Sequence, residues 1–325
     1  RRYNLRNNSD VEFSDKLSLR LDLSVTYSER QTNPYESAVF NIMNSRDPLM
    51  LAQWSDGSYA PFTGGTTNVL PMIEEDLGGT RRTGRIYLSG SVSLNWKPLE
   101  WLSLEGKFSP RLTVVRSHSF NDVVQYHSDP YGNISNVQSR EYSSLTESDA
   151  FTYNSLAQVT ALASKKLGDH SFRLLLGASY EDQDYQTLSA YRQDYAYPEY
   201  EIISAGGDNV FKDNGGTHTE LSLGSFFGRI NYNFRERYLF EANIRADGSS
   251  RFAPENRWGF FPSASAAWRI SEEPFFRPLS RTVTELKMRA SYGTLGNQNI
   301  GSSYYPTAQT LVQSSIFAGT GLHPI

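Results

Sequence analysis

The 325-residue sequence contains no cysteine, which excludes disulfide bonds and thiolate chemistry. It also has no apolar run of about 18 residues, the length that a membrane-spanning helix needs. Basic residues are not in excess, because 35 acidic residues stand against 31 basic ones. Nucleic acid, whose phosphates require a basic stripe, is therefore not expected as a partner.

Sequence signatures of catalysis and metal binding are also missing. There is no Gly-x-Ser-x-Gly elbow and no phosphate-binding glycine loop, and the 5 histidines lack the spacing of a zinc-binding helix. As a glycosidase pair, Glu241 and Asp247 are rejected, because carboxylates beside Arg229 are more typical of a charge ladder across neighbouring strands. A loop flanked by Asp208 and Asp213 lacks the spacing of a calcium loop. We therefore predict no enzyme activity, no cofactor and no metal site.

What the sequence does contain is strict alternation. From Leu17 to Tyr27 every odd residue is apolar and every even residue is polar or charged, so a strand here has two opposite faces. Other segments repeat the pattern, and their apolar sets contain no charge: Ile86, Leu88, Gly90, Val92, Leu94 and Trp96 are one example. A wall between lipid and a wet lumen requires such faces. The alternation therefore favours an outer-membrane β-barrel, and a mean hydropathy of -0.51 agrees with half-polar strands and polar loops.

About ten strands are predicted, at residues 3–13, 17–28, 85–96, 102–115, 151–164, 171–181, 220–233, 238–247, 258–270 and 285–294. Most match the roughly 9 to 11 tilted residues that cross a bilayer. Short turns alternate with long loops at 29–84, 116–150 and 182–219, and the long loops are expected outside the cell. Pro110 and Pro262 fall inside predicted strands, where we expect β-bulges.

Aromatic residues lie beside the short turns. Trp96 and Trp101 bracket one turn, Tyr232 and Tyr238 bracket another, and Trp268 precedes a third. This placement predicts an aromatic girdle at the periplasmic interface. The β-propensity of aromatic residues is the alternative explanation.

A series of ordered motifs begins at Ser225. It comprises Ser225-Phe226-Phe227-Gly228-Arg229-Ile230-Asn231-Tyr232, Tyr238-Leu239-Phe240-Glu241, Asp247-Gly248-Ser249-Ser250-Arg251-Phe252, Asn256-Arg257-Trp258-Gly259-Phe260-Phe261-Pro262-Ser263, Trp268-Arg269-Ile270-Ser271-Glu272-Glu273, Leu286-Lys287-Met288-Arg289-Ala290-Ser291-Tyr292-Gly293 and Gly296-Asn297-Gln298-Asn299-Ile300-Gly301. The series resembles the SusC/RagA family of TonB-dependent outer-membrane transporters. The resemblance is dense over about 75 residues, weaker over 156–181 and only architectural before that. It implies a 22-stranded barrel with an N-terminal plug, a TonB box and a SusD-like lipoprotein lid.

The predicted fold is accordingly all-β: a partial transmembrane antiparallel β-barrel, with about ten strands of a larger 22-stranded barrel and long extracellular loops. Residues 1–325 are expected to form part of a single barrel domain. The plug, the TonB box and the C-terminal strands are expected outside this sequence. Its first residues contain neither Met nor a signal peptide, so it is expected to begin within a longer gene product.

The resemblance carries over a structural role to these motif residues: Gly228, Arg229, Asp247, Gly248, Arg251, Phe252, Trp258, Pro262, Gly296 and Asn297. Asp247-Gly248 has the composition of a tight turn with positive φ, and Arg251 and Arg257 are expected to pair with Asp247 and Glu255. Four loop aromatics are the candidate ligand contacts: Trp54, Tyr59, Tyr126 and Tyr131. Flat rings hold sugars by stacking, but aromatic residues also pack loops together.

The sequence thus predicts a multi-pass protein of the outer membrane that is in contact with lipid. It is expected to import oligosaccharides, or alternatively peptides, with the TonB complex and a SusD-like surface lipoprotein as partners. A passive porin or surface-binding barrel remains the alternative. A barrel hydrolase would need a nucleophile and a base that the sequence does not reveal.

Overall fold

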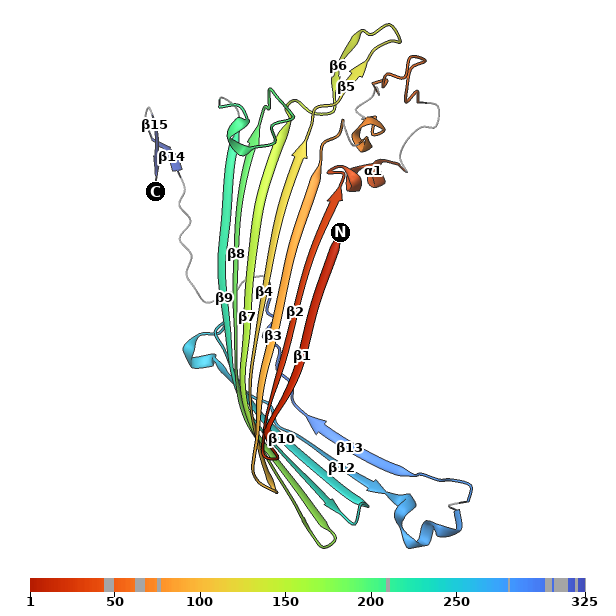
Figure 1. The fold of residues 1–325 in the computed structure, drawn as a ribbon, viewed down its shortest axis with the longest axis vertical. Coiled ribbons are helices and arrows are strands. Elements are labelled where there is room, and N and C mark those ends of the chain that lie inside the picture. Colours follow the sequence, from red (N-terminus) through yellow and green to blue (C-terminus); the bar gives the residue numbers. More distant parts are fainter. Residues whose placement is uncertain are drawn as a thin grey trace.

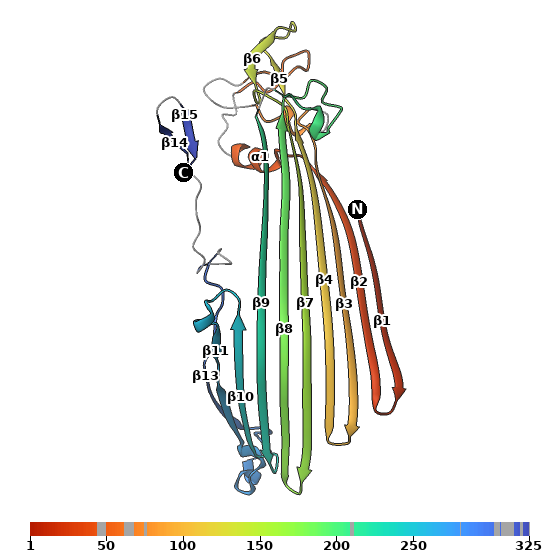
Figure 2. The same cartoon turned by 90° about the vertical axis from the view of Figure 1, so that its left-hand side faces the viewer.

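The computed structural model describes residues 1–43, 50–61, 68–74, 77–208, 211–279, 281–301, 306, 315–318 and 321–324. This part of the chain is dominated by one curved antiparallel sheet, with loops at one end and short turns at the other (Figures 1 and 2). Its strands are β1 (Arg2–Ser14), β2 (Leu17–Thr32), β3 (Arg81–Leu99), β4 (Leu102–Asn121), β7 (Ser144–Leu167), β8 (His170–Gln193), β9 (Lys212–Phe234), β10 (Tyr238–Ser249), β11 (Trp258–Phe260), β12 (Ser263–Arg269) and β13 (Lys287–Gly293). Among the described residues, no helix is long and apolar enough to span a membrane.

Neighbours in the sheet follow chain order. The path is β1-β2-β3-β4-β7-β8-β9-β10-β12-β13, and β11 also pairs with β10. Hairpins of short strands lie outside this path: β5 (Gln125–His127) with β6 (Ile134–Gln138), and β14 (Ser315–Ala318) with β15 (Gly321–Pro324). The all-β, antiparallel prediction is confirmed, and each predicted strand is present, the ninth as β11 and β12 together.

The helices are short and lie in the connections. They are α1 (Glu36–Met43) and the 3-10 helices η1 (Pro71–Ile73), η2 (Ile203–Ala205), η3 (Pro254–Asn256), η4 (Ile270–Glu272) and η5 (Pro274–Leu279). Most of the ordered backbone pairing in the described residues is therefore strand to strand, as a sheet that must satisfy its own N–H and C=O groups requires.

The alternation in sequence becomes two chemically distinct faces. Register pairs like with like: Val159 lies opposite Gly106 on β4 and Ala178 on β8. We call this side the apolar face; its side chains are exposed, for example Val159 at 60% and Phe226 at 61%. The opposite side, the polar face, carries charges such as Glu241. Exposed apolar area of this extent is expected where lipid replaces water as the neighbour.

Aromatic side chains gather near the short turns. Tyr238 stacks on Trp268 with ring centroids 6.4 Å apart, and Tyr232 lies 5.0 Å from Phe172. His170 adds a hydrogen bond to the Tyr232 hydroxyl at 2.8 Å. Neighbouring strands thus join their aromatic residues into one band, which supports the interpretation of a girdle over that of isolated β-propensity.

The strands are longer at the loop end than predicted. β7 and β8 each have 24 residues and pair without interruption from Leu167–His170 to Ser144–Gln193. Residues 182–193 are mostly polar on both faces, so alternation does not reveal them as a strand. The long loops are correspondingly shorter than predicted, because the ladder continues beyond the apolar part of the sheet.

The expected bulges at Pro110 and Pro262 are wrong. Ladder pairing with β3 lapses beside Pro110 but resumes in the same register, with Ser89–Arg111 above and Val92–Phe108 below. Proline has no N–H to give, so a ladder bond is lost without an extra residue. Pro262 separates β11 from β12, and its carbonyl oxygen still accepts the N–H of Thr294 at 3.0 Å.

The predicted turn at Asp247-Gly248 is also wrong. Both residues lie inside β10, opposite Gly259 and Trp258 of β11. The backbone of Gly248 does not have a positive φ, so its conformation does not require glycine. A Cβ at this position would lie 2.8 Å from the indole of Trp258. The glycine is therefore explained by the close approach of an aromatic side chain from the neighbouring strand.

Candidate functional site

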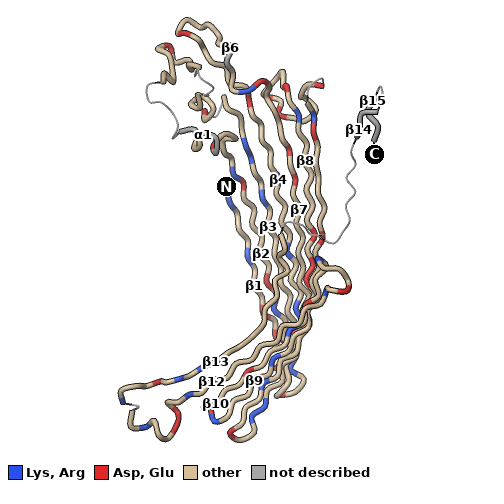
Figure 3. The backbone as a smooth tube through the Cα atoms, turned by 180° about the vertical axis from the view of Figure 1, so that it is seen from behind, with Lys and Arg blue, Asp and Glu red and all other residues tan. Residues whose placement is uncertain are grey.

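A hollow of about 500 Å³ lies on the polar face near the short turns. Its charged lining residues come from neighbouring strands: Arg173 from β8, Arg229 from β9, Glu241 from β10, and Lys287 and Arg289 from β13. Figure 3 shows basic and acidic residues distributed along these strands. Four cations against one carboxylate give this wall a positive character, which suits anionic groups and water.

The carboxylate in this hollow is fixed by neutral partners. Glu241 accepts hydrogen bonds from the side-chain amides of Asn231 at 2.5 Å and Asn243 at 3.0 Å. Among the described residues, no carboxylate lies within ion-pair distance of Arg229. The predicted charge ladder is thus only partly formed, and Arg229 lines the hollow instead.

The motif residues beside the end of β10, about half-way along β8 and β9, meet in a second hollow of about 400 Å³. It is lined by Asp247, Phe252, Gly296 and Asn297, among others. A Cβ on Gly296 would overlap the ring of Phe261. The glycine therefore leaves room for this ring.

Charged motif residues tie this region together. Arg245 pairs with Asp247 at 2.7 Å, although Arg251 and Arg257 were the partners expected for the acidic residues here. Arg251 is buried and donates to the carbonyl oxygen of Gln298 at 3.3 Å. This contact links the segment after β10 to the segment after β13, which the sequence does not reveal.

Two other motif residues belong to the apolar face. Trp258 stacks on Phe226 with centroids 5.9 Å apart. A Cβ on Gly228 would touch Leu176 at 3.3 Å. Both positions therefore act in packing along that face.

The loop aromatics divide into buried and exposed residues. Tyr126 has no exposed surface and donates its hydroxyl to the carbonyl of Asn68 at 2.7 Å, so its prediction as a ligand contact is wrong. Tyr59 packs against the same loop core, and Trp54 donates its indole N–H to the carbonyl of His127 at 2.7 Å. Tyr131 is 87% exposed. Tyr131 is thus the freest of the four to meet a ligand.

The third loop is anchored to the ends of its strands. Tyr195 packs edge-on against Phe120, and burial raises the pKa of Tyr195 to about 12. Asp208 pairs with Lys212 at 2.6 Å and with Arg192. These cations, Lys212 first, hold the pKa of Asp208 below its usual range. Asp208 is therefore engaged in ion pairs with the ends of β8 and β9.

At the opposite end, Glu273 is a buried anchor that the sequence did not single out. Its carboxylate accepts the hydroxyl of Tyr238 at 2.6 Å, the indole N–H of Trp268 at 3.1 Å and a guanidinium N–H of Arg237 at 3.2 Å. These donors, Tyr238 first, lower the pKa of Glu273. The carboxylate of Glu273 thus fixes the orientation of Tyr238 and Trp268, two residues of the aromatic girdle.

Two histidines lie beside carboxylates, and both residue types can bind metal ions. The sequence did not predict a metal site here. His118 bridges Glu147 and Glu201 at 2.6 and 2.5 Å through opposite ring nitrogens. A second group brings Asp184, His218 and Glu220 together. Both sets unite residues from separate segments, which only the strand register and the loop fold reveal.

The sequence was compared with protein families and with known proteins. The β-barrel model of TonB dependent receptor-like proteins matches residues 107–322. TonB-dependent receptor P26 of Formosa agariphila is 28% identical over 97% of this chain and 31% of its own length. TonB-dependent receptor SusC of Bacteroides thetaiotaomicron is 33% identical over 47% of this chain and 15% of its own length.

Among solved structures, the RagAB peptide importer in its 'closed-closed' state matches all of this chain and 35% of the compared chain, with a TM-score of 0.74 and 17% identity. At that identity the likeness shows the fold alone. The chain spans about a third or less of the length of these proteins. Since the family model covers well over half of it, the chain belongs to the β-barrel family of TonB-dependent receptor-like proteins, as its SusC/RagA-like motifs predicted.

Proposed function

We propose that this chain forms part of the barrel wall of a TonB-dependent importer in the outer membrane, which takes up oligosaccharides or, alternatively, peptides. One observation carries the proposal: a single continuous sheet has an exposed apolar face, whose apolar stretch carries no charge, and a charged polar face. Such a sheet separates lipid from a wet passage. In this proposal the cargo is transported without being chemically changed.

The loops support a role in meeting cargo outside the cell. They are packed by their own small cores, Tyr35, Met72, Val124 and Tyr126 in one and Phe120, Leu145 and Tyr195 in the other. A packed loop presents a defined surface instead of a flexible one. Tyr131, on the hairpin that carries β5 and β6, is the ring most available for stacking on a sugar or a peptide side chain.

The partners follow from the family and are part of the same proposal. Energy for uptake would come from the TonB complex, acting on a segment outside this chain. SusC-like and RagA-like relatives make a SusD-like surface lipoprotein the expected lid. Co-purification of such a lipoprotein with the tagged full-length protein tests this point, and a complex that contains none would contradict it.

Uptake by cells tests the function itself. Cells that carry the full-length protein are given labelled oligosaccharides and labelled peptides, with and without TonB. We expect uptake of one class that is lost without TonB. Uptake that persists without TonB would instead indicate a passive porin, and retention of cargo at the surface in both strains would indicate a surface-binding barrel.

A further inference from the structure

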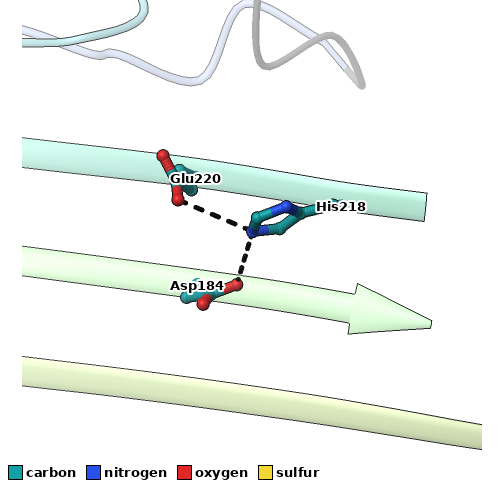
Figure 4. Close-up of side chains that lie close together, drawn as sticks. All are labelled: Asp184, His218 and Glu220. Atoms are coloured by element: carbon teal, nitrogen blue, oxygen red, sulfur yellow. Dashed lines mark ion pairs between the residues drawn. The ribbon is translucent and has the colours of Figure 1, made fainter.

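His218 of β9 lies between two carboxylates on one side of the sheet (Figure 4). Its Nε2 atom is 3.0 Å from Oδ1 of Asp184 and 3.5 Å from Oε1 of Glu220. Asp184 belongs to β8, and the other two residues lie two positions apart on β9. The three side chains therefore project from adjacent, hydrogen-bonded strands, which fixes their Cβ positions.

The strand register places like charges face to face. Asp184 pairs directly with Glu220 across the β8–β9 ladder, and Asp182 follows on the same face. Like charges directly opposite each other destabilise a sheet. A cation between Asp184 and Glu220 would remove this repulsion. On the same face, one pair further along, the chain itself supplies His218 and the side-chain amide of Gln186, which donates to the two oxygens of Asp184 at 3.2 and 3.1 Å.

The position of the carboxylates around the ring points to chelation. Both approach the same nitrogen, Nε2 of His218, and the ligand atoms of the three residues lie within 4.8 Å of one another. In a tetrahedral site with bonds of about 2.0 to 2.1 Å, two ligand atoms are about 3.3 to 3.4 Å apart. The separations of 3.0 and 3.5 Å at His218 bracket that value.

His118 provides the internal contrast. Its two carboxylates, Glu147 and Glu201, approach opposite ring nitrogens. No single ion can be bound by both carboxylates and the ring in that arrangement, so His118 joins a strand to a loop. The group at His218 differs because both of its carboxylates approach the same ring nitrogen.

We propose that Asp184, His218 and Glu220 form a binding site for a divalent first-row metal ion such as Zn²⁺. One imidazole nitrogen and two carboxylate oxygens suit Zn²⁺, whereas Ca²⁺ and Mg²⁺ prefer oxygen ligands alone. Three protein ligands leave a coordination position for water. The side chains are 29% exposed for Asp184, 54% for His218 and 66% for Glu220, so the ion would exchange with the medium.

The site lies beyond the apolar part of the wall. On β8, the residues of the apolar face run Leu174, Leu176, Ala178 and Tyr180, and Asp184 is the second residue after them on that face. At about 3.3 Å per residue, Asp184 is about 13 Å along the strand from Tyr180. The ion would thus bind on the outside of the wall, apart from the passage.

Metal titration of the full-length protein in detergent, after treatment with a chelator, tests the proposal. Calorimetry with Zn²⁺ at pH 7.5 is compared between wild type, His218→Ala and Glu220→Gln. We expect one Zn²⁺ site that each substitution weakens at least about tenfold, because even the loss of a residue that only supports a metal ligand costs that much. Asp149→Asn, on the same face but paired with Arg116, is the control and should bind as wild type does.

Other outcomes overturn the proposal. Zn²⁺ binding that is unchanged in His218→Ala would place the ion elsewhere. The lack of a Zn²⁺ site in the wild type would mean that side chains such as His218 and Gln186 hold the carboxylates without a metal ion. Ca²⁺ binding that equals Zn²⁺ binding and ignores His218→Ala would contradict the ligand set. Heat-dependent gel mobility, measured on every variant, confirms that the variants are folded.

Discussion

An arginine on the apolar face should destabilise the protein far more than one on the polar face. Val159 and Thr160 are consecutive residues of β7 that project to opposite faces. Val159 is 60% exposed and lies between Gly106 and Ala178, which offer an arginine neither a carboxylate nor a ring. Thr160 lies opposite Glu105. Val159→Arg is therefore the test, and Thr160→Arg is its matched control.

The magnitude follows from the depth of Val159. The charge-free run of the apolar face on β7 extends from Phe151 to Ala163, which is about 40 Å along the strand. At a tilt of about 45° this run spans about 28 Å, close to the apolar band of outer-membrane barrels. Val159 lies well inside it. An arginine there costs about 2 to 4 kcal/mol, or roughly 30- to 700-fold in the folding equilibrium.

Folding of the full-length protein into phospholipid vesicles, across a urea series, measures this cost. Heat-dependent gel mobility and tryptophan fluorescence give two independent readings of the folded fraction. Thr160→Arg should shift the midpoint little, since its side chain meets water and Glu105. Equal destabilisation by the two substitutions would refute the assignment of the faces, and a larger effect of Thr160→Arg would reverse it.

Three further predictions address packing and the loops. Gly296→Ala should clash with the ring of Phe261 and cost about 1 to 3 kcal/mol, and Phe261→Ala in the same chain should relieve the clash, as thermal unfolding would show. Tyr126→Ala should cost about 3 to 5 kcal/mol of loop stability, whereas Tyr131→Ala should leave resistance to protease unchanged. Asp208 has a lowered pKa in the folded state, so its ion pairs stabilise the third loop at neutral pH and are lost as the pH falls below about 4. Hydrogen exchange of that loop should show this acid transition in the wild type and not in Asp208→Asn.

The strands could be predicted where their two faces meet different environments, because apolar and polar residues then alternate in the sequence. The segment from Leu17 to Tyr27 alternates without exception and forms β2 as expected. Residues 182–193 extend β8, but both of their faces are mostly polar, so an alternation of period two is not visible there. Pro110 misled for a different reason: a strand within a wide sheet loses one ladder bond without changing register.

The motif glycines show what a motif alone leaves open. Asp247-Gly248 has the composition of a turn, yet the space taken by Trp258 explains the glycine. Turn prediction from composition relies on the backbone conformations that glycine can adopt. In this fold, glycine is needed because the absence of a Cβ leaves space for a neighbouring ring. Only the cross-strand register distinguishes the two, and that register depends on residues outside the motif.

The group of Asp184, His218 and Glu220 also depends on the cross-strand register. Asp184 and His218 are far apart in sequence, and the strand register alone makes them neighbours. One local signal was available, because His218 and Glu220 share a face at period two. The face of β8 that carries Leu176 and Tyr180 stays the same beyond the apolar run, and only the medium that it meets changes. A charge on that face therefore marks where the apolar surroundings end, and it places the proposed metal ion outside the route that cargo would take.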